Sequence, residues 1–262
     1  MCTTPKSPLG DLGVILIYMK KVILLLLLLP MALAAQTPDA KSIIEKIDKN
    51  MTAKTRVMNA TVIIQGRRGS RTMEQKIWSE GELNSFSEYL APAREKGTKM
   101  LKLDKMLWIY DPTTDRTVQI SGHMLRQSVM GSDMSYEDML EDSKLLDKYT
   151  SEITGSEKIG DRDCYVLTLT AKTVDVSYYS RKLWVDKQHY VPLKTELYAK
   201  SGKLLKRTVM SDVIQISGRW FPKTMVFKDM LKDGDGTKFI IDNIQFDVPI
   251  SDYVFSKASL KK

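Results

Sequence analysis

The sequence predicts a mainly β protein with a few helices, in which about eleven antiparallel strands form a barrel or a strongly curved sheet. Short apolar runs separated by turn residues extend over most of the chain, which is the pattern of consecutive β-hairpins. Within many of these runs apolar and polar side chains alternate, as in strands with one buried face. Only two segments, 39–51 and 135–146, have helical features.

The first helix is predicted over residues 39–51. It presents one apolar stripe at helical spacing, formed by Ile43, Ile44, Ile47 and Met51. A stripe of this kind is typical of an amphipathic helix. Asp39 or Thr37 can cap its amino-terminal end, because either side chain can accept a hydrogen bond from a backbone N–H group that has no partner within the helix.

The predicted strands come in two series. The first series lies at 60–65, 71–80, 85–90, 100–103, 107–110 and 118–120. The second series lies at 151–159, 163–170, 181–186, 193–200, 205–216, 219–231 and 237–246. Between them a methionine-rich loop leads into a capping-box sequence at Ser135–Asp138, which predicts a short helix that ends near Leu146. No linker rich in Pro and Gly separates the two series, so we expect one domain.

Alternation within the strands indicates which side chains share a face. Apolar pairs or triplets recur at every second residue or every fourth: Met73 with Ile77, Met225 with Phe227, and Ile240 with Ile244 and Phe246. The positions between them are mostly polar. A single apolar face on so long a sheet has to be covered. Either the sheet closes on itself, or it leaves an apolar cavity.

Residues 1–35 are predicted to be an amino-terminal extension followed by a secretory signal peptide, with the true start at Met19. Lys20 and Lys21 precede an unbroken apolar run, 22–29, and small residues follow at 32–35. The apolar run is shorter than the roughly 20 residues that span a bilayer. The remainder, 36–262, is therefore expected to be a soluble periplasmic domain without a membrane anchor.

Charge and cysteine content narrow the classes of partner. The net charge is +8, and removal of the leader, with Lys6, Lys20, Lys21 and Asp11, would leave about +6. Such a charge suits anionic lipid head groups or acidic partners, and it also fits simple solubility. The basic residues are scattered and not grouped with aromatic ones, so nucleic acid is not an expected partner. Cys164 lies in a strand pattern and is expected to be a buried structural thiol.

Residues for catalysis or metal binding are scarce, and we expect neither an enzyme nor a metal or cofactor. His123 and His189 lack metal-ligand spacing, and both are expected to be exposed loop residues. No nucleophile elbow, phosphate-binding loop or dinucleotide motif is present. The second predicted helix carries an acidic patch, which consists of Asp133, Glu137, Asp138, Glu141 and Asp142. These carboxylates either stabilise the helix through its dipole or form a docking surface for a partner.

The many methionines favour lipid binding, because the flexible and polarisable methionine side chain adapts to varied acyl chains. In the strand at 107–110 either Leu107 and Ile109 or Trp108 and Tyr110 face inward, and the sequence leaves the choice open. The candidate residues of a lipid-binding cavity or its lid are Met73, Ile77, Met100, Leu107, Trp108, Ile109, Tyr110, Met124, Met130, Met134, Met139, Met225 and Phe227. For the methionines the alternative is ordinary filling of the core.

Residues 94–139 contain three distinctive features: WIYDP at 108–112, an Arg five residues after its Asp, and MGSD-x-SYED at 130–138. In these features the chain resembles the LolA-like family, which sorts lipoproteins to the outer membrane. Residues 248–255 also look like the closing segment of that family. The family's lid-locking arginine aligns to no single position here, and the candidates are Arg67, Arg71, Arg94 and Arg126. The MGSD-x-SYED motif resembles that of a divergent branch of the LolA-like family.

The resemblance implies an unclosed antiparallel β half-barrel with a helical lid over an apolar cavity. It also implies a periplasmic carrier of acyl chains of lipoproteins or other lipids, without a cofactor. The partners it implies are an inner-membrane lipid exporter and an outer-membrane acceptor. The alternative is a lipid-sensing, regulatory or transporter-accessory protein on the same fold. An envelope hydrolase is a third hypothesis, against which the shortage of His and nucleophile motifs counts.

Overall fold

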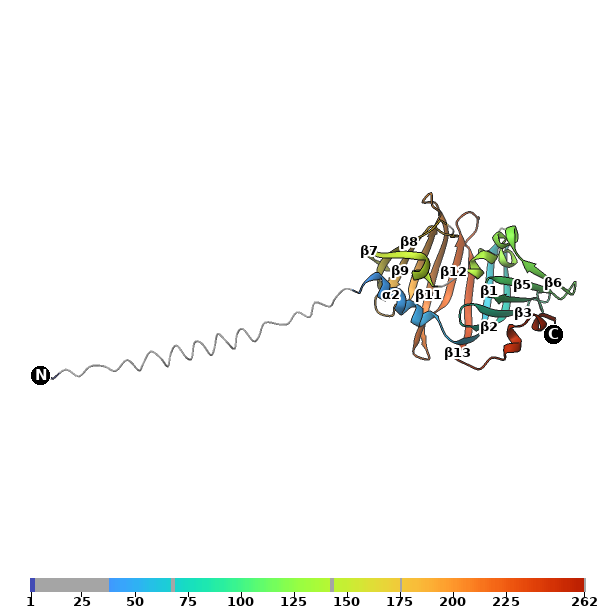
Figure 1. Cartoon of the computed structure of the whole chain (residues 1–262), viewed down its shortest axis with the longest axis horizontal. Helices are drawn as coiled ribbons and strands as arrows, with labels where there is room; N and C mark the ends of the chain where they lie inside the picture. Colours follow the sequence, from blue (N-terminus) through green and yellow to red (C-terminus); the bar gives the residue numbers. More distant parts are fainter. Residues whose placement is uncertain (3–37, 67–68, 142–143, 175, 262) are drawn as a thin grey trace. The chain divides into compact units, whose positions relative to one another are not determined.

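A thirteen-stranded antiparallel sheet is the frame of the described structure (Figure 1). This computed structural model describes residues 1–2, 38–66, 69–141, 144–174 and 176–261. The first six strands are β1 (Thr55–Gly66), β2 (Gly69–Glu80), β3 (Asn84–Ala91), β4 (Lys99–Leu103), β5 (Met106–Asp111) and β6 (Arg116–Ile120). The other seven are β7 (Tyr149–Ile159), β8 (Arg162–Ala171), β9 (Ser180–Asp186), β10 (Pro192–Tyr198), β11 (Leu204–Ile216), β12 (Arg219–Asp229) and β13 (Thr237–Phe246).

The sheet has the strand order β6-β5-β4-β3-β2-β1-β13-β12-β11-β10-β9-β8-β7. Each half is a series of hairpins, and β1 joins β13 in the middle. The two edges of the described sheet, β6 and β7, lie at opposite ends of this order, so the sheet is unclosed and consistent with a half-barrel. The expected count of about eleven strands is too low. The thirteen segments that the sequence indicated as strands, including the short ones at β4, β5 and β6, each correspond to one strand of the sheet.

Much of the hydrophobic core lies on one face, which we call the inner face. Alternate residues of β1 are buried there, namely Met58, Ala60, Val62 and Ile64. Met58 belongs to a cluster that includes Met51 of helix α2 (Ala40–Met51). Val62 packs in a cluster with residues of the segment 121–141. The helix and this segment therefore cover the same face of the sheet.

Helix α2 covers the β7–β9 end of the inner face (Figure 1). Asp39 caps it as predicted, because its carboxylate accepts a hydrogen bond from the Ser42 N–H at 2.7 Å. The helix packs its isoleucines against Tyr149, Leu167, Leu169, Leu183 and Val185. At the other end Arg219 donates to the carbonyl oxygens of Lys49 and Thr52, at 2.7 and 2.6 Å. Both ends of α2 are thus fixed, and the prediction of this helix is confirmed.

The outer face of β3–β5 is covered by the carboxyl-terminal segment, which forms two 3-10 turns, η3 (Asp252–Phe255) and η4 (Lys257–Lys261). Leu260 is fully buried in a cluster with Phe86, Leu101 and Trp108. The Lys257 Nζ atom lies 4.3 Å from the centroid of the Trp108 ring, within the range of a cation–π contact. Strand β5 therefore turns its tryptophan outward.

The second predicted helix, 135–146, is not continuous. Helix α3 (Tyr136–Leu140) begins with the predicted capping box of Ser135 and Asp138, and α4 (Leu145–Lys148) is a separate short helix. The backbone of Glu141 is extended, with φ −68° and ψ 136°, and its carboxylate contacts Arg181 of β9. A helix as short as α3 has little stability of its own, and this contact with the sheet lies at the residue where it ends.

One predicted face in β13 is also corrected. The pairing of β1 with β13 shifts register between Asn59 and Ala60, and such an irregularity changes the face that following residues occupy. As a result Ile241, not Ile240, joins Ile244 and Phe246 in a buried cluster. Alternation alone cannot locate the shift.

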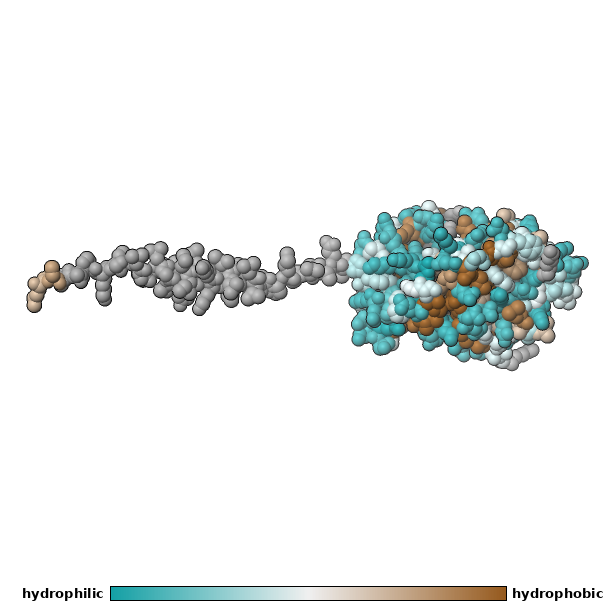
Figure 2. Space-filling view, turned by 90° about the horizontal axis from the view of Figure 1, so that it is seen from below, coloured by the Kyte–Doolittle hydropathy of each residue, from teal (hydrophilic) through white to brown (hydrophobic). Residues whose placement is uncertain are grey.

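Within the described residues no helix is long and apolar enough to cross a membrane. The predicted leader, 1–35, falls from residue 3 onward outside the described residues. On the surface of the unit formed by residues 38–262, apolar side chains gather in the middle of one side, among hydrophilic ones (Figure 2).

Replacement of Asp48 in α2 tests the electrostatics of the helix. Burial raises the pKa of Asp48 to about 6, with further contributions from Glu82 and Glu45. Because the pKa is raised on folding, the ionised carboxylate opposes folding above that value. The penalty disappears as the pH falls toward 3.8, the ordinary pKa of an aspartate side chain. We expect Asp48→Asn to raise the free energy of unfolding by about 1 kcal/mol at about pH 8 and by little at about pH 4.

Chemical denaturation at the two pH values measures this difference. Glu74→Gln, which removes a carboxylate from an exposed position of β2, is the matched control and should change stability little at either pH. A stabilisation by Asp48→Asn that is the same at both pH values would contradict the electrostatic explanation.

Candidate functional site

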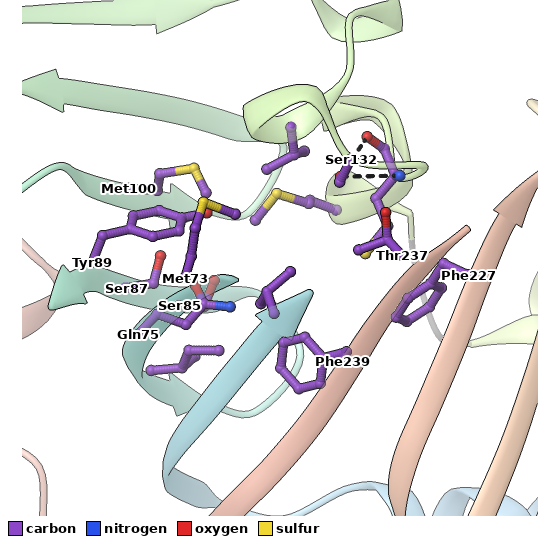
Figure 3. Close-up of a pocket in the computed structure, with 15 residues that line it drawn as sticks. Met73, Gln75, Ser85, Ser87, Tyr89, Met100, Ser132, Phe227, Thr237 and Phe239 are labelled. Carbon is purple, nitrogen blue, oxygen red and sulfur yellow. Dashed lines mark hydrogen bonds between the residues drawn. The ribbon is translucent and has the colours of Figure 1, made fainter. Parts of the chain in front are cut away.

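An apolar cavity of about 170 Å³ lies on the inner face, beneath the segment 121–141 (Figure 3). We call this segment the cover segment; it contains the 3-10 turns η1 (Gly122–Arg126) and η2 (Val129–Gly131) and helix α3. Apolar side chains make up most of the lining: Val62, Met73, Ile77, Tyr89, Met100, Val129, Met134, Met139, Phe227 and Phe239. The polar lining residues are Gln75, Ser85, Ser87, Ser132 and Thr237.

Six of the thirteen candidate residues line this cavity: Met73, Ile77, Met100, Met134, Met139 and Phe227. Four others pack in the hydrophobic cluster around it, namely Leu107, Ile109, Met124 and Met130. Met225 belongs to a neighbouring cluster on the inner face. Trp108 and Tyr110 lie on the outer face against the carboxyl-terminal segment, and the structure does not bring them to the cavity. The inward pair in β5 is therefore Leu107 and Ile109.

The other lining residues were not singled out in the sequence. Val62 and Phe239 pair across β1 and β13, and the alternation in β1 would have indicated Val62. Figure 3 shows Phe239 and Phe227 on one side of the cavity and Met73 and Tyr89 on the other. The serines, Gln75 and Thr237 carry no sequence signal, because polar residues at strand positions are expected to face solvent.

Asp133 anchors the cover segment to the ends of β12 and β13. Its Oδ2 accepts a hydrogen bond from the Thr237 hydroxyl at 2.8 Å, and its Oδ1 accepts one from the Asp229 N–H at 3.0 Å. The Asp133 N–H in turn donates to the Thr237 Oγ1 at 2.9 Å. Asp133 and Thr237 are 6% and 1% exposed. A buried carboxylate is tolerated only with such partners, so these contacts fix the position of the cover segment.

Arg71 of β2 holds the same segment at a second point. Its guanidinium donates to the carbonyl oxygen of Met130 and, at 3.2 Å, to the Glu95 carboxylate. Met130 and Gly131 both have left-handed backbone conformations, with φ of 50° and 76°. This turn presents the Met130 carbonyl to Arg71. Of the four arginines considered for a lid contact, Arg71 is the one for which the structure shows a hydrogen bond to the cover segment; Arg67 lies outside the described residues.

Helix α3 contributes two ion pairs with the strands of the second half. Asp138 contacts Lys206 of β11 and the hydroxyl of Tyr178, and Glu141 contacts Arg181. Burial tends to raise the pKa of Asp138, but Lys206 and hydrogen bonds from Tyr178 and Ser135 outweigh it, so the pKa is lowered overall. For Glu141 burial prevails over the attraction of Arg181, and the pKa is raised.

The acidic patch predicted at the second helix is therefore largely internal. Asp133, Asp138 and Glu141 contact the sheet as described above, and Glu137 accepts a hydrogen bond from the Ser177 hydroxyl at 2.9 Å. Asp142 lies outside the described residues. These four carboxylates attach the cover segment to the strands and to the loop between β8 and β9, which neither the helix-dipole interpretation nor the docking interpretation anticipated.

Outside the cavity, the side chains of Cys164 and His189 are both packed within the fold. Cys164 is fully buried as predicted, and burial, followed by Asp186, raises the pKa of its thiol to about 11. His189 is not the exposed residue that was expected. Its side chain is 13% exposed, its Nδ1 lies 2.8 Å from the Asp186 carboxylate, and its ring lies 3.9 Å from that of Trp220. Within the described residues, no three His, Cys, Asp or Glu side chains are grouped so as to hold a metal ion.

Solved structures with the same fold include three that the chain matches over 85–86% of its length. A DUF1329 family protein from Desulfovibrio piger is 26% identical, with a TM-score of 0.74 and all of that chain covered. A LolA superfamily protein from Nitrosomonas europaea is 25% identical, with a TM-score of 0.69 and all of that chain covered. A domain described as outer membrane lipoprotein-sorting, from Vibrio parahaemolyticus, is 24% identical, with a TM-score of 0.73 and 98% of that chain covered.

A family model with the description "-like: Uncharacterized protein" matches residues 81–262, more than half of the chain. The chain belongs to this family, a divergent branch of LolA-like proteins. A search of curated proteins found no match. The LolA-like resemblance seen in the sequence is confirmed, and the MGSD-x-SYED motif of this LolA-like chain supplies Met130, Asp133 and Asp138, which attach its cover segment.

Removal of the Thr237 hydroxyl tests the anchor. Thr237→Val keeps the shape of the side chain but leaves the buried Asp133 carboxylate and N–H without that partner. We expect a loss of about 2 kcal/mol in the free energy of unfolding, because buried polar groups without partners are costly. We also expect faster amide hydrogen exchange across the cover segment.

Thr61→Val is the matched control, because the Thr61 hydroxyl donates to Asp242 at 2.9 Å on an exposed part of the neighbouring β1–β13 pair. It should have a small effect on stability and none on exchange in the cover segment. Equal effects of the two substitutions would show that Asp133 does not depend on Thr237.

Proposed function

We propose that the protein is a carrier that binds acyl chains of lipoproteins or other lipids in the cavity beneath the cover segment. The observation that carries the proposal is the cavity itself, whose lining is mostly apolar and includes four methionines. Methionine side chains adapt to varied apolar ligands. The LolA-like fold supports this assignment, since a similar domain is described as lipoprotein-sorting.

The size of the cavity implies that the cover segment moves when cargo binds. At about 170 Å³ it is smaller than the roughly 300–1,000 Å³ of typical ligand sites. Displacement of the cover segment would expose the cluster beneath it, to which Leu107 and Ile109 belong. The cover segment would then act as a lid, and the whole apolar surface of the first half would receive the acyl chain.

The physical need for such a carrier follows from the hydrophobic effect. Each methylene group kept from water contributes about 0.8 kcal/mol, so an acylated molecule does not cross an aqueous space unescorted. We place the protein in the periplasm, directed there by the leader at residues 1–35. An inner-membrane lipid exporter as donor and an outer-membrane acceptor complete the route. Transfer would need no cofactor, because no bond is made or broken.

Arg71 is proposed as the latch of the lid. Arg71→Met removes the hydrogen bond to the Met130 carbonyl while keeping an unbranched side chain. We expect the lid to open more often, so that a fluorescent acyl probe associates about tenfold faster, which corresponds to the loss of one charge-assisted hydrogen bond. Stopped-flow fluorescence measures the rate, and hydrogen exchange at 128–136 reports on the lid.

Arg94→Met is the control for this experiment, because Arg94 is an exposed arginine just beyond β3 that was also considered for the latch. It should leave both the association rate and the exchange unchanged. If Arg71→Met behaves like Arg94→Met, Arg71 is not the latch.

Blocking the cavity tests the function directly. Ser87 of β3 lines the cavity and is 7% exposed. Ser87→Phe should fill the space at a cost of about 1–3 kcal/mol in stability. Lipid mass spectrometry of the protein purified from the periplasm of a Gram-negative host should find acyl lipid with the wild type and much less with this variant.

Ser211→Phe places the same side chain at an exposed position of β11 and is the matched control. It should retain the lipid. A wild-type protein that carries no lipid and does not bind an acyl probe would refute the carrier function.

A further inference from the structure

A second cavity, of about 210 Å³, adjoins the first on the inner face. The two cavities share Met134 of the cover segment and Phe227 of β12 in their linings. The second cavity is otherwise bounded by strands β9–β12, with Leu197 and Met210 among its apolar residues. Met134 and Phe227 therefore separate the two cavities, and a molecule in the first cavity would reach the second if these two side chains moved aside.

The second cavity differs from the first in its charge. Four cationic side chains line it, together with three carboxylates: the cations are Arg181, Lys206, Arg207 and Lys228. Side chains of the strands supply all four cations, whereas the cover segment supplies the carboxylates. Asp138 contacts Lys206, and Glu141 contacts Arg181. The carboxylates of the cover segment thus occupy positions that anionic oxygen atoms of a ligand could take.

Arg181 retains a donor that these contacts do not use. Its Nη2 serves both the Glu141 carboxylate and, at 3.2 Å, the Tyr149 hydroxyl. Its Nε is buried and has no hydrogen-bond partner. Buried polar atoms without a partner are uncommon, and a guanidinium group is suited to bind two oxygen atoms of one phosphate at once. A single carboxylate contact leaves that capacity unused.

We propose that the second cavity binds the phosphate of an anionic lipid whose acyl chain occupies the first cavity. The inference rests on the proposed carrier function and specifies its cargo. The phosphate takes the place of Asp138 and Glu141 at Lys206 and Arg181, and so releases helix α3 from the sheet. The diacylglyceryl and amide-linked acyl groups of a lipoprotein anchor carry no charge. A phospholipid therefore uses these cations, and a lipoprotein anchor does not.

The test compares short-chain lipids that differ only in the head group. Dihexanoyl phosphatidic acid, dihexanoyl phosphatidylcholine and dihexanoylglycerol, each below its micellar concentration, are titrated into the protein by isothermal calorimetry. We expect phosphatidic acid to bind at least about tenfold more tightly than the other two, which corresponds to one charge-assisted hydrogen bond. Glycerol 3-phosphate, which has no acyl chain, is expected to bind more weakly than all three.

Two variants separate head-group recognition from the attachment of the cover segment. Arg181→Gln should abolish most of the preference for phosphatidic acid. Asp138→Asn removes the competing carboxylate from Lys206 and should increase the preference. Both substitutions weaken the attachment of α3, so a purely structural role would change the affinities for all lipids alike and leave their ratio unchanged. Lys158→Gln, at an exposed position of β7, is the control for net charge and should leave the ratio unchanged.

Each other outcome overturns a defined part of the argument. Equal affinities for the three lipids, with no change of ratio in the variants, would refute the head-group site and leave the carrier function standing. Binding of glycerol 3-phosphate as tight as that of phosphatidic acid would show a site for a soluble phosphate compound and would refute a lipid ligand. Failure of all three lipids to bind would refute the carrier function itself.

Discussion

The attachment of Asp133 to Thr237 and to the backbone of Asp229 is the contact on which the inner face depends. A sheet with one apolar face requires a cover, and over the first half that cover is a loop with short helical turns. Such a segment has little stability of its own. Its position comes from the polar contacts along it, at Met130, Asp133, Asp138 and Glu141, and from the insertion of Val129 and Tyr136 into the cluster beneath. The shape of the cavity is therefore set at the rim of the sheet.

The two halves of the inner face are closed in different ways. Helix α2 closes the second half with fully buried isoleucines, and interior packing of this kind is dense and costly to open. The cover segment also packs apolar side chains into the cluster beneath it, but its attachment to the strands relies on hydrogen bonds and ion pairs. Water can replace such contacts at a low net cost. We therefore expect the movement that admits a ligand to involve the cover segment and not helix α2.

Local patterns explain which predictions were right. The capping residues at Asp39 and Ser135 and the alternation at Met73 were sufficient, because each depends on neighbours in the chain. The orientation of Trp108 depends on a segment about 150 residues away, at Leu260. The contact between Arg71 and Met130 likewise joins distant positions, so nothing local distinguished Arg71 from the other arginines. Irregular pairing in β13 changed the face of Ile241.

The contacts of the cover segment fall into two kinds, and this division determines how it can open. The hydrogen bonds of the Asp133 carboxylate come from a hydroxyl and a backbone N–H group, which are uncharged, and the Lys228 ammonium lies farther away, at 4.0 Å. Glu141 is held by Arg181, and burial raises the pKa of its carboxyl, so its charge is incompletely compensated there. A phosphate that competes for Arg181 would release α3 first. The cover segment would then pivot about Asp133 without leaving the sheet.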